Sequence, residues 1–217
     1  ITGRPKGVIH THRNELHNVR HHTNSLFLNP ADRLTLLGSY STGQGMQDLY
    51  CALLNGATLY PWSVKSDGLT GIADWLIGER MTVYHSAATV FRHFVRHLSG
   101  EEEFSRLRIV RLGSEQVSWK DVESFRKHFS RECVFVNALS SSETKTIRQY
   151  VLSSDSPISG MVPVGYPVED MDVLLLDESG NELGFNQVGE ITVRSRYLSP
   201  GYWRKPDLTA AAYRADP

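Results

Sequence analysis

A loop that combines two glycines, a proline and a lysine opens the chain. Residues 2–8 read Thr-Gly-Arg-Pro-Lys-Gly-Val, which places Gly3 and Gly7 on either side of Pro5 and Lys6. Glycine lets backbone amides approach a ligand closely, proline stiffens the loop, and the lysine ammonium is a compact charge suited to phosphate. In the Walker loop the lysine instead follows the second glycine and a hydroxyl residue comes next. We interpret residues 2–8 as a binding loop for nucleotide phosphates, with an ordinary surface turn as the alternative.

Two polar stretches come directly after predicted strands. Gly113-Ser114-Glu115 follows the apolar run at 107–112, and the serine-rich stretch 137–144 follows the apolar run at 133–136. Ligands of open α/β sheets usually bind at the carboxyl ends of the strands. The second stretch offers hydroxyls for phosphate oxygens and, in Glu143, a carboxylate for a hard cation such as Mg²⁺. The structural alternatives are a turn at a strand end and a plain serine-rich loop.

Alternating helices and strands must position these loops. Helix patterns are predicted at residues 12–26, 46–54, 69–78, 87–98 and 119–129, and strand patterns at 34–37, 57–60, 82–84, 107–112 and 133–136. Strands and helices that alternate at this spacing imply parallel βαβ units in a layered α/β fold. A helix that begins just after the lysine loop would direct its amino-terminal amides at an anion.

The pattern changes after residue 150. Residues 153–157 are polar and turn-rich, and the strands predicted at 172–176 and 190–193 flank a turn typical of an antiparallel hairpin. We therefore expect a subdomain boundary near residue 158. Residues 1–158 would form the α/β subdomain, and residues 159–217 would begin a β-rich, barrel-like antiparallel subdomain.

Composition excludes several classes of protein. The chain has 217 residues, 40% hydrophobic and 22% charged, with a net charge of −1, which describes an ordinary globular protein without bias toward nucleic acid or anionic membranes. Cys51 and Cys133 lie in apolar runs and are expected to be reduced core residues. With neither a membrane-length apolar run nor a signal-peptide pattern, a cytoplasmic protein is expected. The missing initiator methionine and the abrupt end suggest a fragment of a longer protein.

The histidine pairs give little support for a metal site. His17 and His21, and likewise His93 and His97, stand four residues apart on predicted helices, which puts both rings of a pair on one face. Neither pair has the glutamate of a His-Glu-x-x-His zinc site, and no cysteine is near. We expect no structural metal at either pair.

Taken together, the motifs resemble those of the adenylate-forming superfamily, which includes acyl-CoA synthetases, luciferases and the adenylation domains of nonribosomal peptide synthetases. The resemblance extends over essentially the whole chain. Residues 2–8 resemble the second half of the family's phosphate loop, and Ser142-Glu143 matches its Thr-Glu pair. The later segments that match are Gly165-Tyr166-Pro167, Gly189-Glu190, Gly201-Tyr202 and residues 206–209.

This resemblance implies a two-step reaction. A carboxylic acid attacks the α-phosphate of ATP to give an acyl-adenylate and pyrophosphate, and the acyl group then passes to the thiol of coenzyme A or of a carrier protein's phosphopantetheine. The implied catalytic residues are Lys6 at the β- and γ-phosphates, Ser142 at the α-phosphate and Glu143 at Mg²⁺. The implied nucleotide-binding residues are Thr2, Gly3, Lys6, Gly7, Gly113, Ser114, Glu115, Asn137, Ala138, Leu139 and Ser142. The implied substrate-pocket residues are Gly43, Ser86, Val110, Leu112, Ala138, Thr146 and Ile147, most of which are equally plausible as core residues.

Departures from the family pattern bear on substrate and activity. Leu139 replaces the aromatic residue that stacks on adenine, which weakens stacking. Gly43 stands where amino-acid-activating members have an aspartate, and a glycine cannot neutralise an ammonium group. An acyl, aryl or hydroxy acid is therefore expected unless Asp48, predicted on the helix surface, reaches the pocket.

Activity of the chain by itself is not expected. The family's ribose-binding aspartate and catalytic lysine would lie beyond Pro217. The alternative to an enzyme fragment is a non-catalytic relative that serves as a protein-interaction module, although the presence of Lys6 and Glu143 argues against it. Coenzyme A and a carrier protein both remain open as acyl acceptor, with a slight preference for the carrier.

Overall fold

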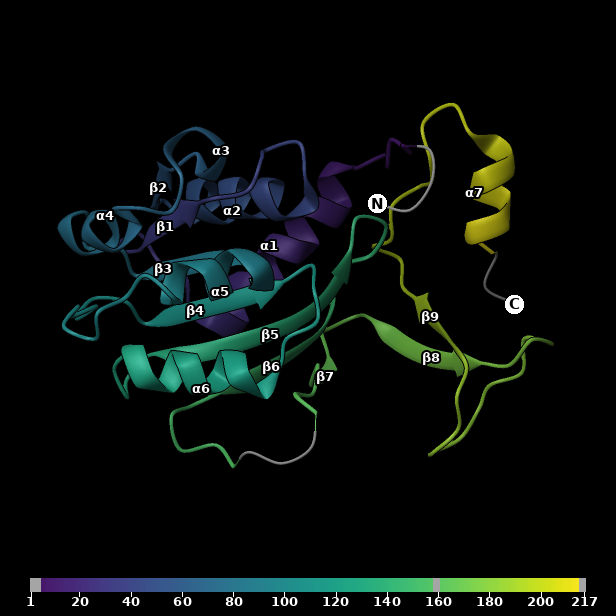
Figure 1. The fold of residues 1–217 in the computed structure, drawn as a ribbon. Helices are drawn as coiled ribbons and strands as arrows, with labels where there is room; N and C mark the ends of the chain where they lie inside the picture. The colour runs from purple at the N-terminus through teal and green to yellow at the C-terminus, as the bar shows by residue number, and fades with distance from the viewer. Residues whose placement is uncertain (1–4, 158–160, 215–217) are drawn as a thin grey trace.

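A mixed β-sheet organises the molecule. The computed structural model describes residues 5–157 and 161–214, and within them seven strands form one sheet in the order β2-β1-β3-β4-β5-β6-β7 (Figure 1). The strands are β1 (Arg33–Leu36), β2 (Thr58–Pro61), β3 (Val83–Ala87), β4 (Ile109–Gly113), β5 (Val134–Ser141), β6 (Lys145–Leu152) and β7 (Tyr166–Pro167). Strands β1 to β5 are parallel, whereas β6 and β7 run antiparallel. The predicted α/β fold is confirmed.

Helices pack on both faces of this sheet. The described helices are α1 (His12–Leu26), α2 (Gly43–Leu54), α3 (Val64–Asp67), α4 (Ile72–Gly78), α5 (Ala88–Val95), α6 (Trp119–His128) and α7 (Pro206–Ala212). The short helices α3 and α7 bury no residue. Apolar residues of α1 and α2 pack on one face, against β1, β3, β4 and β5, while α4, α5 and α6 pack on the other (Figure 1). Strands β3, β4 and β5 therefore lie between two helical layers.

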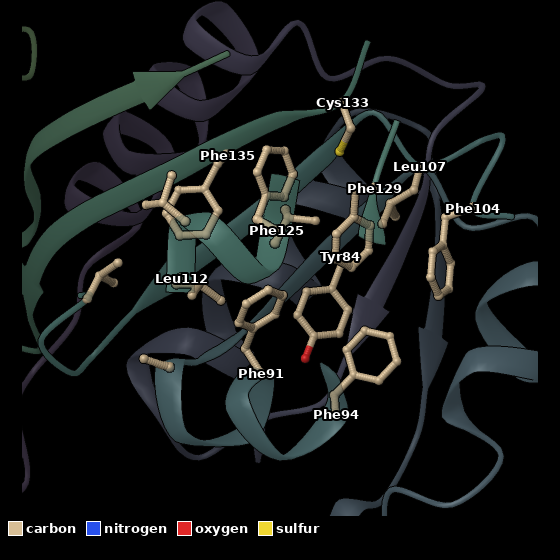
Figure 2. Packing of buried hydrophobic residues seen from close by; sticks show 14 of the residues in the cluster. Tyr84, Phe91, Phe94, Phe104, Leu107, Leu112, Phe125, Phe129, Cys133 and Phe135 are labelled. Atoms are coloured by element: carbon tan, nitrogen blue, oxygen red, sulfur yellow. The ribbon is translucent and has the colours of Figure 1, made fainter. Parts of the chain in front are cut away.

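The face under α5 and α6 is an aromatic core (Figure 2). Its rings are those of Tyr84, Phe91, Phe94, Phe104, Phe125, Phe129 and Phe135. Neighbouring centroids lie 5.0 Å apart for Phe104 and Phe129 and 5.3 Å apart for Phe125 and Phe135, within the range for favourable aromatic pairs. Cys133 lies in this core, and both cysteines are buried free thiols.

Local signals explain the best-predicted element, helix α1. The Thr11 hydroxyl accepts from the Asn14 amide, and Asn14 Oδ1 accepts from the Thr11 amide at 2.6 Å, which completes a capping box. Phe27 ends the helix in the left-handed conformation. The predicted range 12–26 is confirmed.

Other predicted elements need correction. Helix α2 begins three residues before the predicted 46 because the Thr42 hydroxyl caps it by accepting from the Gly45 amide at 3.2 Å. The serine-rich stretch is mostly strand, since β5 extends to Ser141 and only residues 142–144 form a turn. The sequence did not predict β6, β7, α3 or α7, and the two unpredicted strands add an antiparallel edge to the predicted parallel βαβ units.

The predicted hairpin is confirmed as a separate antiparallel pair of β8 (Asp172–Leu176) and β9 (Glu190–Arg194). The boundary expected near residue 158 falls at residues 158–160, which lie outside the described residues. Strand β7 follows that point and still belongs to the large sheet, so the division at residue 158 stays a prediction.

Replacing Gly165 by alanine is expected to destabilise the fold strongly. Gly165 has φ +76°, and an added Cβ would lie 1.9 Å from the Gln149 carbonyl oxygen. Gly180 is the matched control, because its φ is +85° but nothing lies within 4 Å of the added Cβ. Both variants should lose about 1–2 kcal/mol from the left-handed backbone, and Gly165→Ala should lose about 1–3 kcal/mol more from overpacking. Urea unfolding measures the difference, and equal losses would contradict the prediction.

Candidate functional site

The lysine loop is joined to a segment near the end of the chain. The Trp203 amide donates to the Gly7 carbonyl at 2.7 Å, and the Ile9 amide donates to the Gly201 carbonyl at 2.9 Å. Val8 and Tyr202 form an antiparallel bridge between these bonds. The loop therefore has a strand-like partner. Its predicted nucleotide-binding residues Thr2 and Gly3 lie outside the described residues.

Lys6 and Glu143 come together around Tyr202. The Lys6 ammonium lies 3.9 Å from Glu143 Oε1 and 4.6 Å from the centre of the Tyr202 ring. The Tyr202 hydroxyl donates to Glu143 Oε1 at 2.7 Å and accepts from Lys6 Nζ at 3.3 Å. This cluster unites the start of the chain, the β5–β6 turn and the segment after β9, which also approach one another in Figure 1.

Electrostatics keep the Glu143 carboxyl ionised. Burial disfavours its charged form, but hydrogen bonds from Tyr202 and from the turn itself, together with the nearby Lys6 charge, hold the pKa of Glu143 below its ordinary value. Burial and the adjacent carboxylate raise the pKa of Tyr202 to about 12. At neutral pH the cluster thus presents a carboxylate, a neutral phenol and an ammonium group.

Glu143 also suits a cation shared with a ligand. Its side chain is 27% exposed, and an Mg²⁺ site commonly uses one or two carboxylates together with substrate phosphates. Among the residues that the structure describes, no three His, Cys, Asp or Glu side chains group as a metal site. A cation at Glu143 would therefore take most of its ligands from phosphate and water.

Ser142 lies beside the first residue of α2. A Cβ added to Gly43 would sit 3.8 Å from Ser142 Oγ. Both residues were predicted for the site, one facing the α-phosphate and one in the substrate pocket, and the fold brings them to the same place.

In the predicted nucleotide-binding segments 113–115 and 137–139, some side chains already bond to other parts of the chain. Glu115 accepts from the Thr89 amide at 2.7 Å, and Asn137 donates to the Pro163 carbonyl at 2.9 Å. Ser114, with φ +65°, turns the chain after Gly113 at the end of β4. Leu139 packs beside an apolar cluster that contains Ile147, and Ala138 is buried.

The remaining predicted pocket residues lie on different faces. Val110 and Leu112 are fully buried in the aromatic core under α5 and α6, and the buried Ser86 hydroxyl donates to the Ala87 carbonyl at 3.0 Å. Thr146 lies elsewhere, where it accepts from Arg111 at 3.2 Å. The structure therefore places Thr146, but not Val110 or Leu112, among polar side chains.

A buried polar cluster under α2, formed by Asp48, His85 and Arg111, was not predicted from the sequence. Asp48, predicted on the helix surface, is 4% exposed, so that prediction is wrong. Asp48 Oδ1 lies 2.6 Å from His85 Nδ1, and His85 Nε2 lies 2.6 Å from Arg111 Nη1. Burial lowers the pKa of His85 despite the neighbouring aspartate, and a neutral ring that donates to Asp48 and accepts from Arg111 fits both contacts. The sequence signal that could have revealed this cluster is the presence of His85 and Arg111 inside otherwise apolar strand patterns.

A buried ion pair between Lys145 and Glu15 supports the β5–β6 turn. Lys145 Nζ lies 2.5 Å from Glu15 Oε1 of α1, and His10 Nδ1 lies 3.2 Å from the same oxygen. Lys145 adopts φ +61° directly after the turn. The pair therefore fixes the turn that carries Glu143 to the start of α1.

The histidine pairs make ordinary contacts. His17 stacks on Tyr197 with 3.9 Å between ring centroids, and its Nε2 lies 3.0 Å from the Glu169 carbonyl. His97 Nδ1 lies 2.7 Å from the His93 carbonyl.

Across the described ranges, no helix has both the length and the apolar character needed to cross a membrane.

The candidate site thus consists of a mixed β-sheet whose connecting segments bring Lys6 and the ionised Glu143 together around Tyr202. The chain belongs to the AMP-binding enzyme family, whose model matches residues 1–203. It is related to the adenylation domains of nonribosomal peptide synthetases.

Individual relatives agree with this assignment. Bacitracin synthase 3 of Bacillus licheniformis is 27% identical over 217 residues, which are 100% of this chain but 3% of that protein. The crystal structure of CmiS6 matches 99% of this chain and 52% of its own, with 24% identity and a TM-score of 0.89. The structure of the nonribosomal peptide synthetase FmoA3 matches 97% of this chain and 23% of its own, with 22% identity and a TM-score of 0.89. The two structural matches show the shared fold.

Proposed function

We propose that this chain is part of an ATP-dependent enzyme that converts a carboxylic acid to its acyl-adenylate and transfers the acyl group to a thiol. The observation that carries the proposal is the meeting of Lys6 and Glu143 around Tyr202. Activation of a carboxylate by ATP requires charge neutralisation and alignment more than covalent work by the protein. A lysine and a cation-binding carboxylate supply these at one place.

Each residue has a distinct role in the first step. Lys6 and the amide of Gly7 hold the β- and γ-phosphates, the Ser142 hydroxyl faces the α-phosphate, and Glu143 holds Mg²⁺. When bound, Mg²⁺ neutralises phosphate charge and favours departure of pyrophosphate. The segments 113–115 and 137–139 flank the adenine.

The proposed substrate is an acid without an α-ammonium group. Gly43, beside Ser142, provides no negative charge. Asp48, the alternative partner for an ammonium group, is held by His85. An acyl, aryl or hydroxy acid therefore suits the site better than a standard α-amino acid, because an unpaired buried ammonium group is costly.

For the second step we propose the phosphopantetheine thiol of a carrier protein, with coenzyme A as the alternative. The relation to nonribosomal peptide synthetases favours the carrier. A competing proposal is a non-catalytic relative that serves in protein contacts, which the presence of the Lys6 and Glu143 charges at one place disfavours.

ATP–pyrophosphate exchange by the full-length protein, run with a panel of carboxylic acids, tests the function. We expect exchange that requires Mg²⁺ and an acid from the aryl, hydroxy or acyl groups. Exchange restricted to standard α-amino acids would contradict the substrate proposal. Absence of Mg²⁺-dependent ATP binding in calorimetry would favour the non-catalytic relative.

A further inference from the structure

The Tyr202 hydroxyl bridges two opposite charges, those of Glu143 and Lys6. Its hydroxyl bonds to both Glu143 Oε1 and Lys6 Nζ, at 2.7 and 3.3 Å, while the two charged groups stay 3.9 Å apart. A direct contact between them would neutralise both groups and compete with their ligands. A neutral phenol orients the carboxylate and leaves its charge available to a cation.

The backbone around Tyr202 fixes the position of its hydroxyl. The Tyr202 amide donates to Thr209 Oγ1 at 3.0 Å, and the Ser199 amide donates to the Glu143 carbonyl at 2.9 Å. Tyr202 is 7% exposed. Residues 199–203 are therefore tied on one side to the lysine loop and on the other to the β5–β6 turn.

We propose that Tyr202 is a positioning residue of the adenylation site, which holds Glu143 oriented toward the cation and spaces it from Lys6. The inference rests on the proposed function, because it assigns Glu143 to Mg²⁺ and Lys6 to phosphate. It goes beyond that function by making the segment after β9 part of the nucleotide site. Tyr202 acts through Glu143 and touches neither the reacting atoms nor the acid.

The variant Tyr202→Phe tests this role in the full-length protein. It keeps the ring beneath Lys6 and removes only the hydroxyl. We expect the Mg²⁺ concentration for half-maximal ATP binding, measured by calorimetry without added acid, to rise about tenfold, as for loss of a group that orients a metal ligand. ATP–pyrophosphate exchange should require the same increase in Mg²⁺.

A pH profile separates positioning from a general structural effect. Glu143 binds a cation only when ionised, and its pKa is lowered in the native protein, so Mg²⁺-dependent ATP binding declines as the pH falls through that pKa. Without the Tyr202 hydroxyl the pKa rises, and the acid limb should move to higher pH. The other titratable groups facing Glu143 are Lys6, His10 and Tyr213, and they are unchanged in the variant.

Tyr213→Phe is the matched control. The Tyr213 ring lies 5.8 Å from the Tyr202 ring, and its hydroxyl bonds to Ser199 Oγ. It should leave both the Mg²⁺ requirement and the acid limb unchanged. Native Mg²⁺ and pH dependence in Tyr202→Phe would overturn the positioning role while the function stands. Absence of Mg²⁺-dependent ATP binding in the native protein would instead overturn the proposed function, and the inference with it.

Discussion

Replacement of Glu143 by glutamine is expected to lower the rate of acid-dependent ATP–pyrophosphate exchange by about 100-fold or more. Losses of this size follow when a preorganised electrostatic contact is removed. The amide keeps the size of the side chain and can still accept from Tyr202, but it has no charge for Mg²⁺. The β5–β6 turn should remain in place, because the Lys145–Glu15 pair and the Ser199–Glu143 backbone bond do not involve the carboxylate.

Exchange kinetics, together with the melting temperature, check this expectation. Glu123→Gln, on the exposed side of α6, makes the same chemical change away from the site and should exchange at the native rate. Melting temperatures of the two variants should lie close to the native value. If Glu143→Gln exchanges at the native rate, the mechanism does not need the Glu143 carboxylate. A large fall in the melting temperature of this variant would instead indicate a structural role for Glu143.

Local sequence signals predicted some elements well and others poorly. Helix α1 was predicted with its observed bounds because the cap at Thr11 lies next to the helix it starts. Strand β6 was missed because its pairing depends on β5, and the serines between 140 and 142 resemble a loop when read alone. In the structure β5 continues through Ser140 and Ser141, with a register shift between Leu139 and Ser140.

For the candidate site, contacts between residues far apart in the sequence were even harder to predict than the strand pairing. Motif spacing pointed to Lys6, Ser142 and Glu143, and the fold brings Lys6 to Glu143. The contacts of Tyr202 could not be read from the sequence, because they join it to residues 59 and 196 positions away. Asp48 was misplaced for the same reason, since its burial depends on His85, a partner 37 positions away.

Replacement of Arg111 by methionine is expected to destabilise the fold by about 3–5 kcal/mol, as when a buried charge loses the charge that compensates it. Arg111 is 3% exposed and bonds to His85 and Thr146. Its loss leaves the Asp48 carboxylate buried without a compensating cation. Equilibrium urea unfolding measures the loss, and Arg194→Met is the control. Arg194 lies 3.1 Å from Asp172 with half of its side chain exposed, so its loss should be about 0–1 kcal/mol.

A double-mutant cycle separates lost charge balance from lost packing. Asp48→Asn removes the second buried charge while keeping an acceptor for His85. If the uncompensated aspartate causes the instability of Arg111→Met, the double variant Asp48→Asn with Arg111→Met should be more stable than Arg111→Met alone, with a coupling of about 1–3 kcal/mol. Additive losses would show that Arg111 stabilises the fold by filling volume between β4 and α2. The contacts that link Asp48 to Arg111 through His85 would then add nothing to the free energy of unfolding.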